Sequence, residues 1–333
     1  MPFPAGAAWV AADGRRRASA VAGSARRDTL WDLASLTKPL LVGTLLMRAV
    51  ASGAASLSDT VPLPDGRAVH LTDLLAHRAG LRAWSDLPAA VDAALGHARA
   101  GRWSPTDADA RGALDAALAR ECAEADLARG TLYSDFGFIL LGRELERRFG
   151  APLAALVERA GLRGVRLGGL APPPDARRFA PTELCPRRGR LLRGEVHDAN
   201  AWALGGAAGH AGAFATAATV GRWALDLADA ARGRPASLDG GVVRAFWDPT
   251  WRAPGGTWVL GWDTPSASGS TAGARVSASA VGHLGFTGTS VWIDREADLV
   301  TVLLTHRVAG GPGALAALRA FRPWFHDAVR ELL

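Results

Sequence analysis

The stretch from residue 31 to residue 51 reads WDLASLTKPLLVGTLLMRAVA, a polar beginning followed by a long apolar run. From residue 36 onward the apolar residues recur at helical spacing, which predicts a buried helix that ends before Gly53. Pro39 fits a helix only in the first turn, where its missing N–H has no intrahelical partner in any case. We therefore expect the helix to begin near Ser35.

Ser35 and Lys38 follow the pattern S-x-x-K, so on a helix they share one face, with their Cβ atoms about 5–6 Å apart. Lys38 is the only lysine among the 38 lysines and arginines of the chain. An arginine stays protonated in proteins, whereas a lysine amine can lose its proton and act as a base. The free N–H groups of a helix N-terminus also favour an anion on the serine. The pattern predicts a serine nucleophile with a lysine base.

The composition is that of a folded globular protein, because 49% of the 333 residues are hydrophobic and 21% are charged. The length corresponds to about two domains of roughly 150 residues. The net charge of +6 comes from arginine pairs scattered over separate segments, and we expect no nucleic-acid partner. Cys122 and Cys185 are too few for a disulfide framework, and we expect both to be reduced.

The chain contains no predicted membrane segment. The apolar run after Lys38 stops at Arg48, far short of the ~20 residues that a bilayer requires. At the N-terminus the apolar residues precede the arginines at 15–17, which is the reverse of the order in a secretory signal. We therefore expect a cytoplasmic protein without a membrane partner. The sequence leaves its oligomeric state and natural substrate open.

Strands are predicted at both ends of the chain and helices between them. Small and β-branched residues around the turn Asp13-Gly14 indicate a hairpin of residues 5–11 and 18–23. Further strands are predicted at 256–263, 279–286, 289–294 and 299–305, and further helices at 71–77, 86–99, 106–128, 135–149, 152–160, 216–231 and 312–332.

The first two strands and the last three can bury their apolar faces only by pairing with one another. This predicts an α+β fold, an α-β sandwich with a mainly antiparallel five-stranded sheet flanked by helices. Residues 1–60 and 200–333 then form the sheet domain, and residues 61–199 form an inserted helical subdomain. Together they make one catalytic unit.

Several segments resemble the class C β-lactamase and penicillin-binding-protein superfamily, which includes esterases and D-amino-acid peptidases. The resemblance runs from about residue 5 to residue 330. It is carried by residues 31–38, residues 71–81 (LTDLLAHRAGL), residues 132–138 (LYSDFGF, similar to the Tyr-x-Asn element) and residues 282–289 (GHLGFTGT, similar to the Lys-Thr-Gly strand in its His-x-Gly form). Residues 195–200 (EVHDAN) and 209–212 (GHAG) resemble the non-lactamase branch.

The resemblance implies a β-lactamase/transpeptidase-like fold and an acyl-enzyme on Ser35, with Lys38 as the base or proton relay. Tyr133, the only tyrosine in the chain, would be the second acid–base group. The backbone N–H groups of Ser35 and Phe286 would form the oxyanion hole, and Gly285 would let the strand approach the nucleophile closely. No cofactor and no metal ion is implied.

Two departures from the superfamily pattern concern the substrate. Asp135 replaces the amide of Tyr-x-Asn, and its charge would repel a substrate carboxylate. His283 replaces the lysine that grips the carboxylate of penicillins, and it changes charge between about pH 5 and 8 unless burial keeps it neutral. We therefore expect a serine hydrolase that acts on small neutral esters or amides, with weak β-lactamase activity at best.

Two alternatives remain open: a D-amino-acid peptidase, amidase or penicillin-binding protein, and a catalytically silent scaffold that binds acyl groups. Trp84 and Trp262 lie close to the motifs in sequence and are candidates for the substrate cavity, although most tryptophans belong to the core. His197, Asp198 and His210 lack the spacing of metal ligands, so we expect them to make structural hydrogen bonds.

Overall fold

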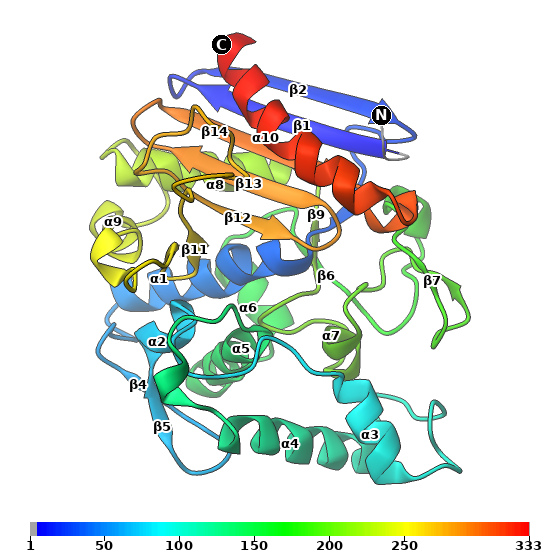
Figure 1. The fold of residues 1–333 in the computed structure, drawn as a ribbon. Coiled ribbons are helices and arrows are strands. Elements are labelled where there is room, and N and C mark those ends of the chain that lie inside the picture. The colour runs from blue at the N-terminus through cyan, green and yellow to red at the C-terminus, as the bar shows by residue number, and fades with distance from the viewer. Residues whose placement is uncertain (1–4, 333) are drawn as a thin grey trace.

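The computed structural model describes residues 5–332. At its centre is a seven-stranded antiparallel sheet in the strand order β10-β11-β12-β13-β14-β1-β2. The strands are β1 (Ala5–Ala12), β2 (Arg16–Gly23), β10 (Trp258–Val259), β11 (Trp262–Asp263), β12 (Val281–Gly285), β13 (Thr289–Asp294) and β14 (Leu299–Thr305). Strands β1 and β14 pair, so the two ends of the chain close one sheet, as the sequence predicts (Figure 1).

The segment predicted as one strand at 256–263 is a short hairpin, and it extends the expected five strands to seven. Strands β10 and β11 pair with Val259 opposite Trp262. The chain reverses at Gly261, whose φ of +79° lies in the left-handed region that glycine adopts without a steric cost. Strand β11 then pairs with β12 through Asp263 and Gly282, which places the hairpin beside the His-x-Gly strand.

Helices cover both faces of the sheet. Helix α10 (Ala314–Leu332) lies across one face, and helix α8 (Ala217–Ala231) lies behind the other (Figure 1). Helix α9 (Gly240–Phe246) packs against α8. Helix α8 begins where the sequence predicts, because the Thr216 side chain accepts a hydrogen bond from the Thr219 N–H and so caps the first turn.

The helical part of the chain lies below the sheet in Figure 1. It contains α2 (Leu71–Leu75), α3 (Leu87–Leu95), α4 (Ala108–Ala123), α5 (Asp135–Phe149), α6 (Leu153–Arg159) and α7 (Ala199–Ala203). Two hairpins that the sequence does not reveal accompany these helices: β4 (Thr60–Pro62) with β5 (Ala68–His70), and β7 (Leu184–Cys185) with β8 (Arg190–Leu191).

A small three-stranded sheet connects the helical part to the nucleophile segment. Strand β9 (Ala213–Ala215) pairs with β3 (Trp31–Asp32) on one side and with β6 (Arg166–Leu167) on the other. Strand β3 comes just before Ser35, and β6 comes from the stretch assigned to the helical subdomain. Segments far apart in the sequence therefore meet beside the S-x-x-K pattern.

The helix of the S-x-x-K stretch changes its geometry along its length. Ala34–Leu36 form a 3₁₀ turn, Lys38–Gly43 form a π-helical turn, and α1 (Thr44–Ala51) is a regular α-helix. In the π turn the Thr44 N–H reaches back to the Pro39 carbonyl, five residues earlier. Helical structure begins near Ser35 as Pro39 predicts, but apolar periodicity does not reveal the wide turn.

By length and composition alone, residues 34–51 would be sufficient to cross a membrane. In this fold every residue from Leu36 to Met47 is buried within the protein. The apolar character of the segment is thus accounted for by its position as the core helix that carries Ser35 and Lys38.

Candidate active site

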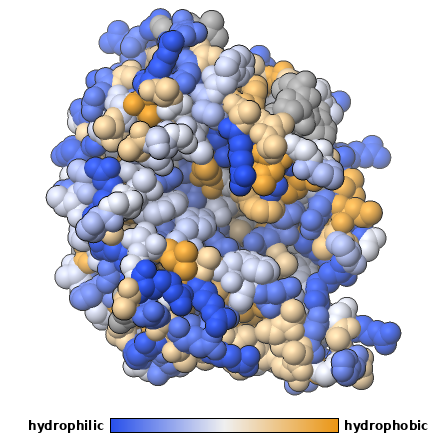
Figure 2. Space-filling view, viewed as in Figure 1, coloured by the Kyte–Doolittle hydropathy of each residue, from blue (hydrophilic) through white to orange (hydrophobic). Residues whose placement is uncertain are grey.

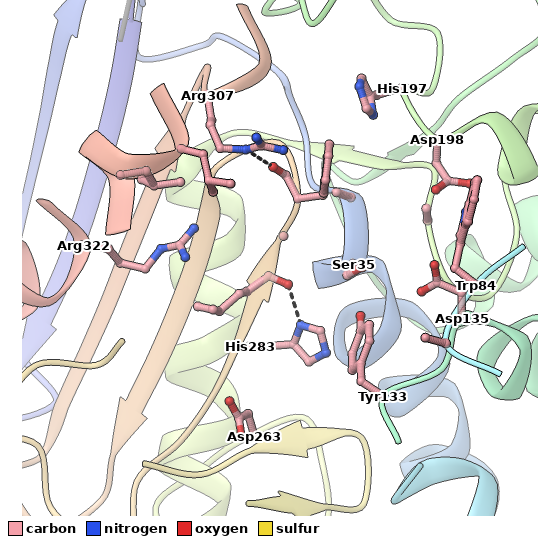
Figure 3. A pocket seen from close by; sticks show the side chains of 18 of the residues that line it. Ser35, Trp84, Tyr133, Asp135, His197, Asp198, Asp263, His283, Arg307 and Arg322 are labelled. Carbon is pink, nitrogen blue, oxygen red and sulfur yellow. Dashed lines mark hydrogen bonds between the residues drawn. The ribbon is translucent and has the colours of Figure 1, made fainter. Parts of the chain in front are cut away.

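A cavity of about 810 Å³ lies where the sheet, helix α10 and the helical part of the chain meet. The predicted site residues on its wall are Ser35, Trp84, Tyr133, Asp135, His283, Gly285 and Phe286 (Figure 3). Exposed apolar side chains, among them Phe286 and Leu315, also line it. Most of the face in Figure 2 is hydrophilic, and its hydrophobic residues gather on the right, on the side where α10 begins in Figure 1.

Lys38 makes the central polar contacts of the site, and its side chain is completely buried. Its Nζ donates hydrogen bonds to Ser35 Oγ at 3.0 Å, to Asp135 Oδ1 at 2.6 Å and to the His210 carbonyl at 3.3 Å. Three acceptors match the three protons of an ammonium group. Burial lowers the pKa of Lys38, but Asp135 and Tyr133 raise it, and the net shift is upward. The resting lysine is therefore an ammonium ion.

Tyr133 lies beside this pair, with its ring centre 4.9 Å from Lys38 Nζ. The rings of His77, Trp258 and His283 surround it at centroid distances of 4.6, 5.1 and 6.0 Å, which fixes its orientation. Burial raises the pKa of the Tyr133 phenol, Lys38 lowers it and Asp135 raises it again, with a net upward shift. Both candidate bases thus hold their protons in the resting site.

Asp135 has a different place from the one expected from the sequence. It begins helix α5, and its carboxylate forms a close ion pair with Lys38 instead of facing the cavity as a free charge. Its negative charge therefore acts first on the protonation of Lys38 and Tyr133, and its repulsion of a substrate carboxylate is partly neutralised by the ammonium group.

Replacing Asp135 by asparagine should shift the acidic limb of the kcat/KM–pH profile to lower pH. Lys38 or Tyr133 must lose a proton before it can accept one from Ser35, and the Asp135 carboxylate raises the pKa of both groups. Removing that charge lowers both pKa values, so the active base form is reached at lower pH. The measurement is kcat/KM for 4-nitrophenyl butyrate over the range in which the protein stays folded.

Asp115→Asn provides a matched control, because Asp115 is exposed on α4 and pairs there with Arg143. Its pH profile should coincide with that of the parent. An acidic limb that keeps its position, or moves to higher pH, in Asp135→Asn would show that the Asp135 charge does not govern the base.

The end of strand β12 is held tightly against the residues before Ser35. Thr289 Oγ1 donates a hydrogen bond to the Leu33 carbonyl at 3.1 Å, and Thr287 Oγ1 donates one to the Asp32 carbonyl at 2.7 Å. A Cβ on Gly285 would lie 2.5 Å from the Leu33 carbonyl oxygen, so only glycine permits this approach. The approach brings the backbone of Phe286 to the cavity wall beside Ser35, as an oxyanion hole formed by their N–H groups requires.

Asp32 organises the turn that presents the nucleophile, and the sequence argument gave it no role. Its Oδ1 accepts a hydrogen bond from the Ala34 N–H at 2.8 Å, and its Oδ2 accepts one from the His197 N–H at 2.7 Å. Ala34 has a φ of +46°, a left-handed conformation that costs energy for a residue other than glycine. The buried carboxylate therefore holds a strained residue directly before Ser35.

His283 is buried on the cavity wall, and of the two outcomes expected for it the neutral ring holds, so its charge does not change between pH 5 and 8. Burial, and then the charge of Lys38, lowers the pKa of His283 to about 3. Its Nδ1 lies 2.8 Å from the Leu284 carbonyl, and its Nε2 is buried without a hydrogen-bond partner among the described residues. The ring is neutral at physiological pH and is no substitute for the positive charge of a lysine.

Trp262 does not line the cavity, which corrects its proposed place in the substrate site. It is fully buried, stacked 5.5 Å from Trp223 and packed edge-on against Trp247. Trp258, four residues earlier, lines the cavity instead. The two residues lie on different strands of the hairpin, and only the side chain of Trp258 reaches the cavity. Trp84 is half exposed at the cavity, as expected.

Ligand atoms of Asp135, Asp198 and His210 lie within 4.8 Å of one another and could in principle hold a metal ion. The Lys38 ammonium is 2.6 Å from Asp135, and its positive charge would repel a divalent cation there. His210 Nε2 lies 2.9 Å from Asp198 Oδ1, and the His210 carbonyl accepts a hydrogen bond from Lys38. The chemistry of this cluster fits a hydrogen-bonded support for Lys38 better than a metal centre.

His77 is a further residue of the site for which the sequence argument stated no role. Its Nδ1 accepts a hydrogen bond from the Ser134 N–H at 3.1 Å, and its ring packs on Tyr133. His77 belongs to the segment at 71–81 that already resembles the superfamily, so the signal lay in the motif. The contact itself depends on the meeting of α2 and the start of α5.

Three comparisons place the chain among known proteins. A family model described as Beta-lactamase matches residues 2–321. An N-acetylmuramyl-L-alanine amidase from Bacillus subtilis is 30% identical over 199 residues, which cover 53% of this chain and 44% of that protein. The match thus spans less than half the length of this relative.

Solved structures share the fold over nearly the whole chain. A beta-lactamase from Mycobacterium bovis has a TM-score of 0.61 at 24% identity, with 99% of this chain and 95% of that chain covered. EstCE1, a hydrolase with promiscuous acyltransferase activity, has a TM-score of 0.67 at 19% identity, with 96% and 94% covered. Together with the family match over residues 2–321, this shows that the chain belongs to the Beta-lactamase family and is a serine hydrolase of that superfamily.

Proposed function

We propose that the protein is an esterase or amidase that forms an acyl-enzyme on Ser35. The observation that carries this proposal is the contact of the buried Lys38 ammonium with both Ser35 Oγ and Asp135, beside the ring of Tyr133. A lysine in a fully buried position is rare unless it is paired, and here it contacts the hydroxyl of a cavity-lining serine. These contacts support Ser35 as the nucleophile and Lys38 with Tyr133 as the proton-transfer unit.

The reaction proceeds in two acyl-transfer steps. Once Lys38 or Tyr133 has lost its proton, it accepts the Ser35 proton while Oγ forms a bond to the carbonyl carbon of the substrate. The carbonyl oxygen becomes negative and is stabilised by the N–H groups of Ser35 and Phe286. The C–O or C–N bond then breaks, and the leaving group takes up the proton. In the second step a water molecule gives a proton to the base and attacks the carbonyl carbon of the acyl-enzyme. The bond to Ser35 Oγ then breaks, Oγ takes the proton back, and the acid product is released.

The cavity supports a small ester or amide as the substrate. About 810 Å³ is in the range of pockets that enclose small organic molecules, and apolar side chains such as Trp84, Trp258 and Phe286 form part of the wall. EstCE1, described as a hydrolase with promiscuous acyltransferase activity, supports acyl transfer as the type of reaction. The neutral ring of His283 offers no cation to a substrate carboxylate at its position, so any such cation must come from another part of the cavity.

Covalent labelling tests the proposal. A fluorophosphonate should add its phosphonyl group to one residue, and peptide mass spectrometry should locate the adduct on Ser35. The same preparation should turn over at least one member of a panel of 4-nitrophenyl esters, D-amino-acid amides and nitrocefin. An adduct on Ser35 without turnover of any member would instead favour the catalytically silent scaffold, and an adduct elsewhere would contradict the assignment of the nucleophile.

A further inference from the structure

Three arginines line one end of the active-site cavity: Arg307, which follows strand β14, and Arg319 and Arg322, which lie one turn apart on helix α10. In Figure 3, Arg307 and Arg322 lie on one side of Ser35, whereas Trp84, Asp135 and Asp198 lie on the other. The reacting serine thus lies between two chemically different arms of the cavity.

Arg322 is the most informative of the three, because it is only 7% exposed and still lines the cavity. One Nη donates a hydrogen bond to the Thr289 carbonyl at 3.2 Å, and its Nε is buried and has no hydrogen-bond partner in the part of the chain that the structure describes. Burial, and then the charge of Arg307, lowers the pKa of Arg322 to about 10, so the group is still charged at neutral pH. Burying a guanidinium ion without a counter-ion is costly.

Arg307 and Arg319 do not supply that counter-ion, since both add positive charge. Arg307 Nε donates a hydrogen bond to the Phe286 carbonyl at 2.6 Å, and its guanidinium carbon lies 4.0 Å from the centre of the Phe286 ring. Arg307 is thereby held next to the residue whose N–H serves the oxyanion hole. Burial, and then the charge of Arg319, lowers the pKa of Arg307, which also indicates that no anion compensates this end of the cavity.

The carboxylates of the cavity wall do not neutralise the three arginines. Within residues 5–332, no aspartate or glutamate forms an ion pair with Arg307, Arg319 or Arg322. Three of the wall carboxylates form ion pairs with other residues: Asp135 with Lys38 at 2.6 Å, Asp198 with His210 at 2.9 Å and Glu183 with His197 at 3.3 Å. Burial raises the pKa of the remaining wall carboxyl, Asp263, to about 6, and in Figure 3 it lies below His283, away from Arg307.

We propose that Arg307, Arg319 and Arg322 form an anion-binding subsite, and that the ester or amide cleaved at Ser35 carries a negatively charged group, such as a carboxylate, on the arm toward α10. This inference rests on the proposed function and refines its substrate class. It replaces the preference for neutral substrates that the loss of a lysine at position 283 suggests, because arginines from other elements provide the charge.

The test uses two pairs of substrates that differ in charge but little in size. In the first pair the acyl group carries the charge: the 4-nitrophenyl monoester of glutaric acid is compared with 4-nitrophenyl valerate. In the second pair the leaving group carries it: 3-carboxyphenyl acetate is compared with 3-carbamoylphenyl acetate. The readout is the ratio of kcat/KM for the anionic member to that for the neutral member, so general losses of activity cancel.

In the parent protein the ratio should exceed one for at least one pair, and that pair identifies which part of the substrate lies toward α10. Arg322→Gln keeps a donor for the Thr289 carbonyl but removes the charge, and it should lower the ratio by about 10- to 100-fold. Arg222→Gln is the matched control, because Arg222 is an exposed arginine on α8, behind the opposite face of the sheet, and should keep the parent ratio.

Two results would overturn the proposal. One is a parent ratio at or below one for both pairs, and the other is a ratio that Arg322→Gln leaves at the parent value. If Arg322→Gln does not fold, Arg319→Gln provides the test, because Arg319 is exposed and its replacement should leave the fold intact. The ratio measured for Arg319→Gln must then fall below that of the parent. Hydrolysis of the neutral esters tests the proposed function separately, so a serine hydrolase without the anion subsite is distinguishable from a protein with no hydrolase activity.

Discussion

Replacing Ser35 by alanine should lower kcat/KM for every hydrolysed ester by about 10⁴- to 10⁶-fold, since residues that act as one catalytic unit lose nearly all of their effect together. Ser35 Oγ is the cavity-lining acceptor of the Lys38 hydrogen bond, and alanine removes the only atom that can form the acyl bond. Steady-state kinetics with 4-nitrophenyl butyrate, and loss of fluorophosphonate labelling, measure the effect.

Ser52→Ala is the control for this variant, because Ser52 follows the same helix and its hydroxyl only donates to the Ala49 carbonyl. Its activity should match that of the parent. Thermal unfolding of Ser35→Ala should stay close to that of the parent, since one hydroxyl is removed without opening a large void. Ester hydrolysis at the parent rate by folded Ser35→Ala would mean that another residue is the nucleophile.

The layout of the fold was predictable because its signals are local or come from the two ends of the chain. The strands were recognised as short apolar runs bounded by turn signals, and the long helices by the spacing of their apolar residues. Strands β1, β13 and β14 are buried almost throughout, whereas β2 is exposed along its length, so no alternation of buried and exposed residues marks them. The hairpin around Gly261 was missed because two-residue strands are too short to show alternation. The π turn at Lys38–Gly43 was missed because its apolar residues are buried on all sides.

The active site was most clearly predictable where a motif and a rare residue coincide. The single lysine and the single tyrosine carry the acid–base assignment, and the structure places them side by side. The ion pair of Lys38 with Asp135 joins residues 97 positions apart, and no local pattern encodes its length of 2.6 Å. In the same way, the arginine cluster arises because the segment after β14 and one face of α10 meet at the cavity.

The ion pair does not by itself explain why a lysine, and not an arginine, stands at position 38. An arginine would keep the positive charge that Asp135 compensates, so electrostatics alone would permit the exchange. Arginine differs from lysine in two other respects: its guanidinium group is larger than an ammonium group, and it does not give up a proton in proteins. We therefore expect that the site uses lysine because the charge must be removable.

Lys38→Arg should consequently be about as inactive as Lys38→Met, with kcat/KM lowered by about 10³-fold or more in both. In Lys38→Arg the charge beside Asp135 persists but no proton can leave, and the planar group must also fit a fully buried space with acceptors at 2.6 to 3.3 Å. In Lys38→Met the side chain is similar in length but has neither charge nor proton. Kinetics and thermal unfolding are measured for both. If Lys38→Arg keeps more than about a tenth of the parent activity, a permanently charged group suffices, and Lys38 acts as an electrostatic support for Tyr133 and not in proton transfer.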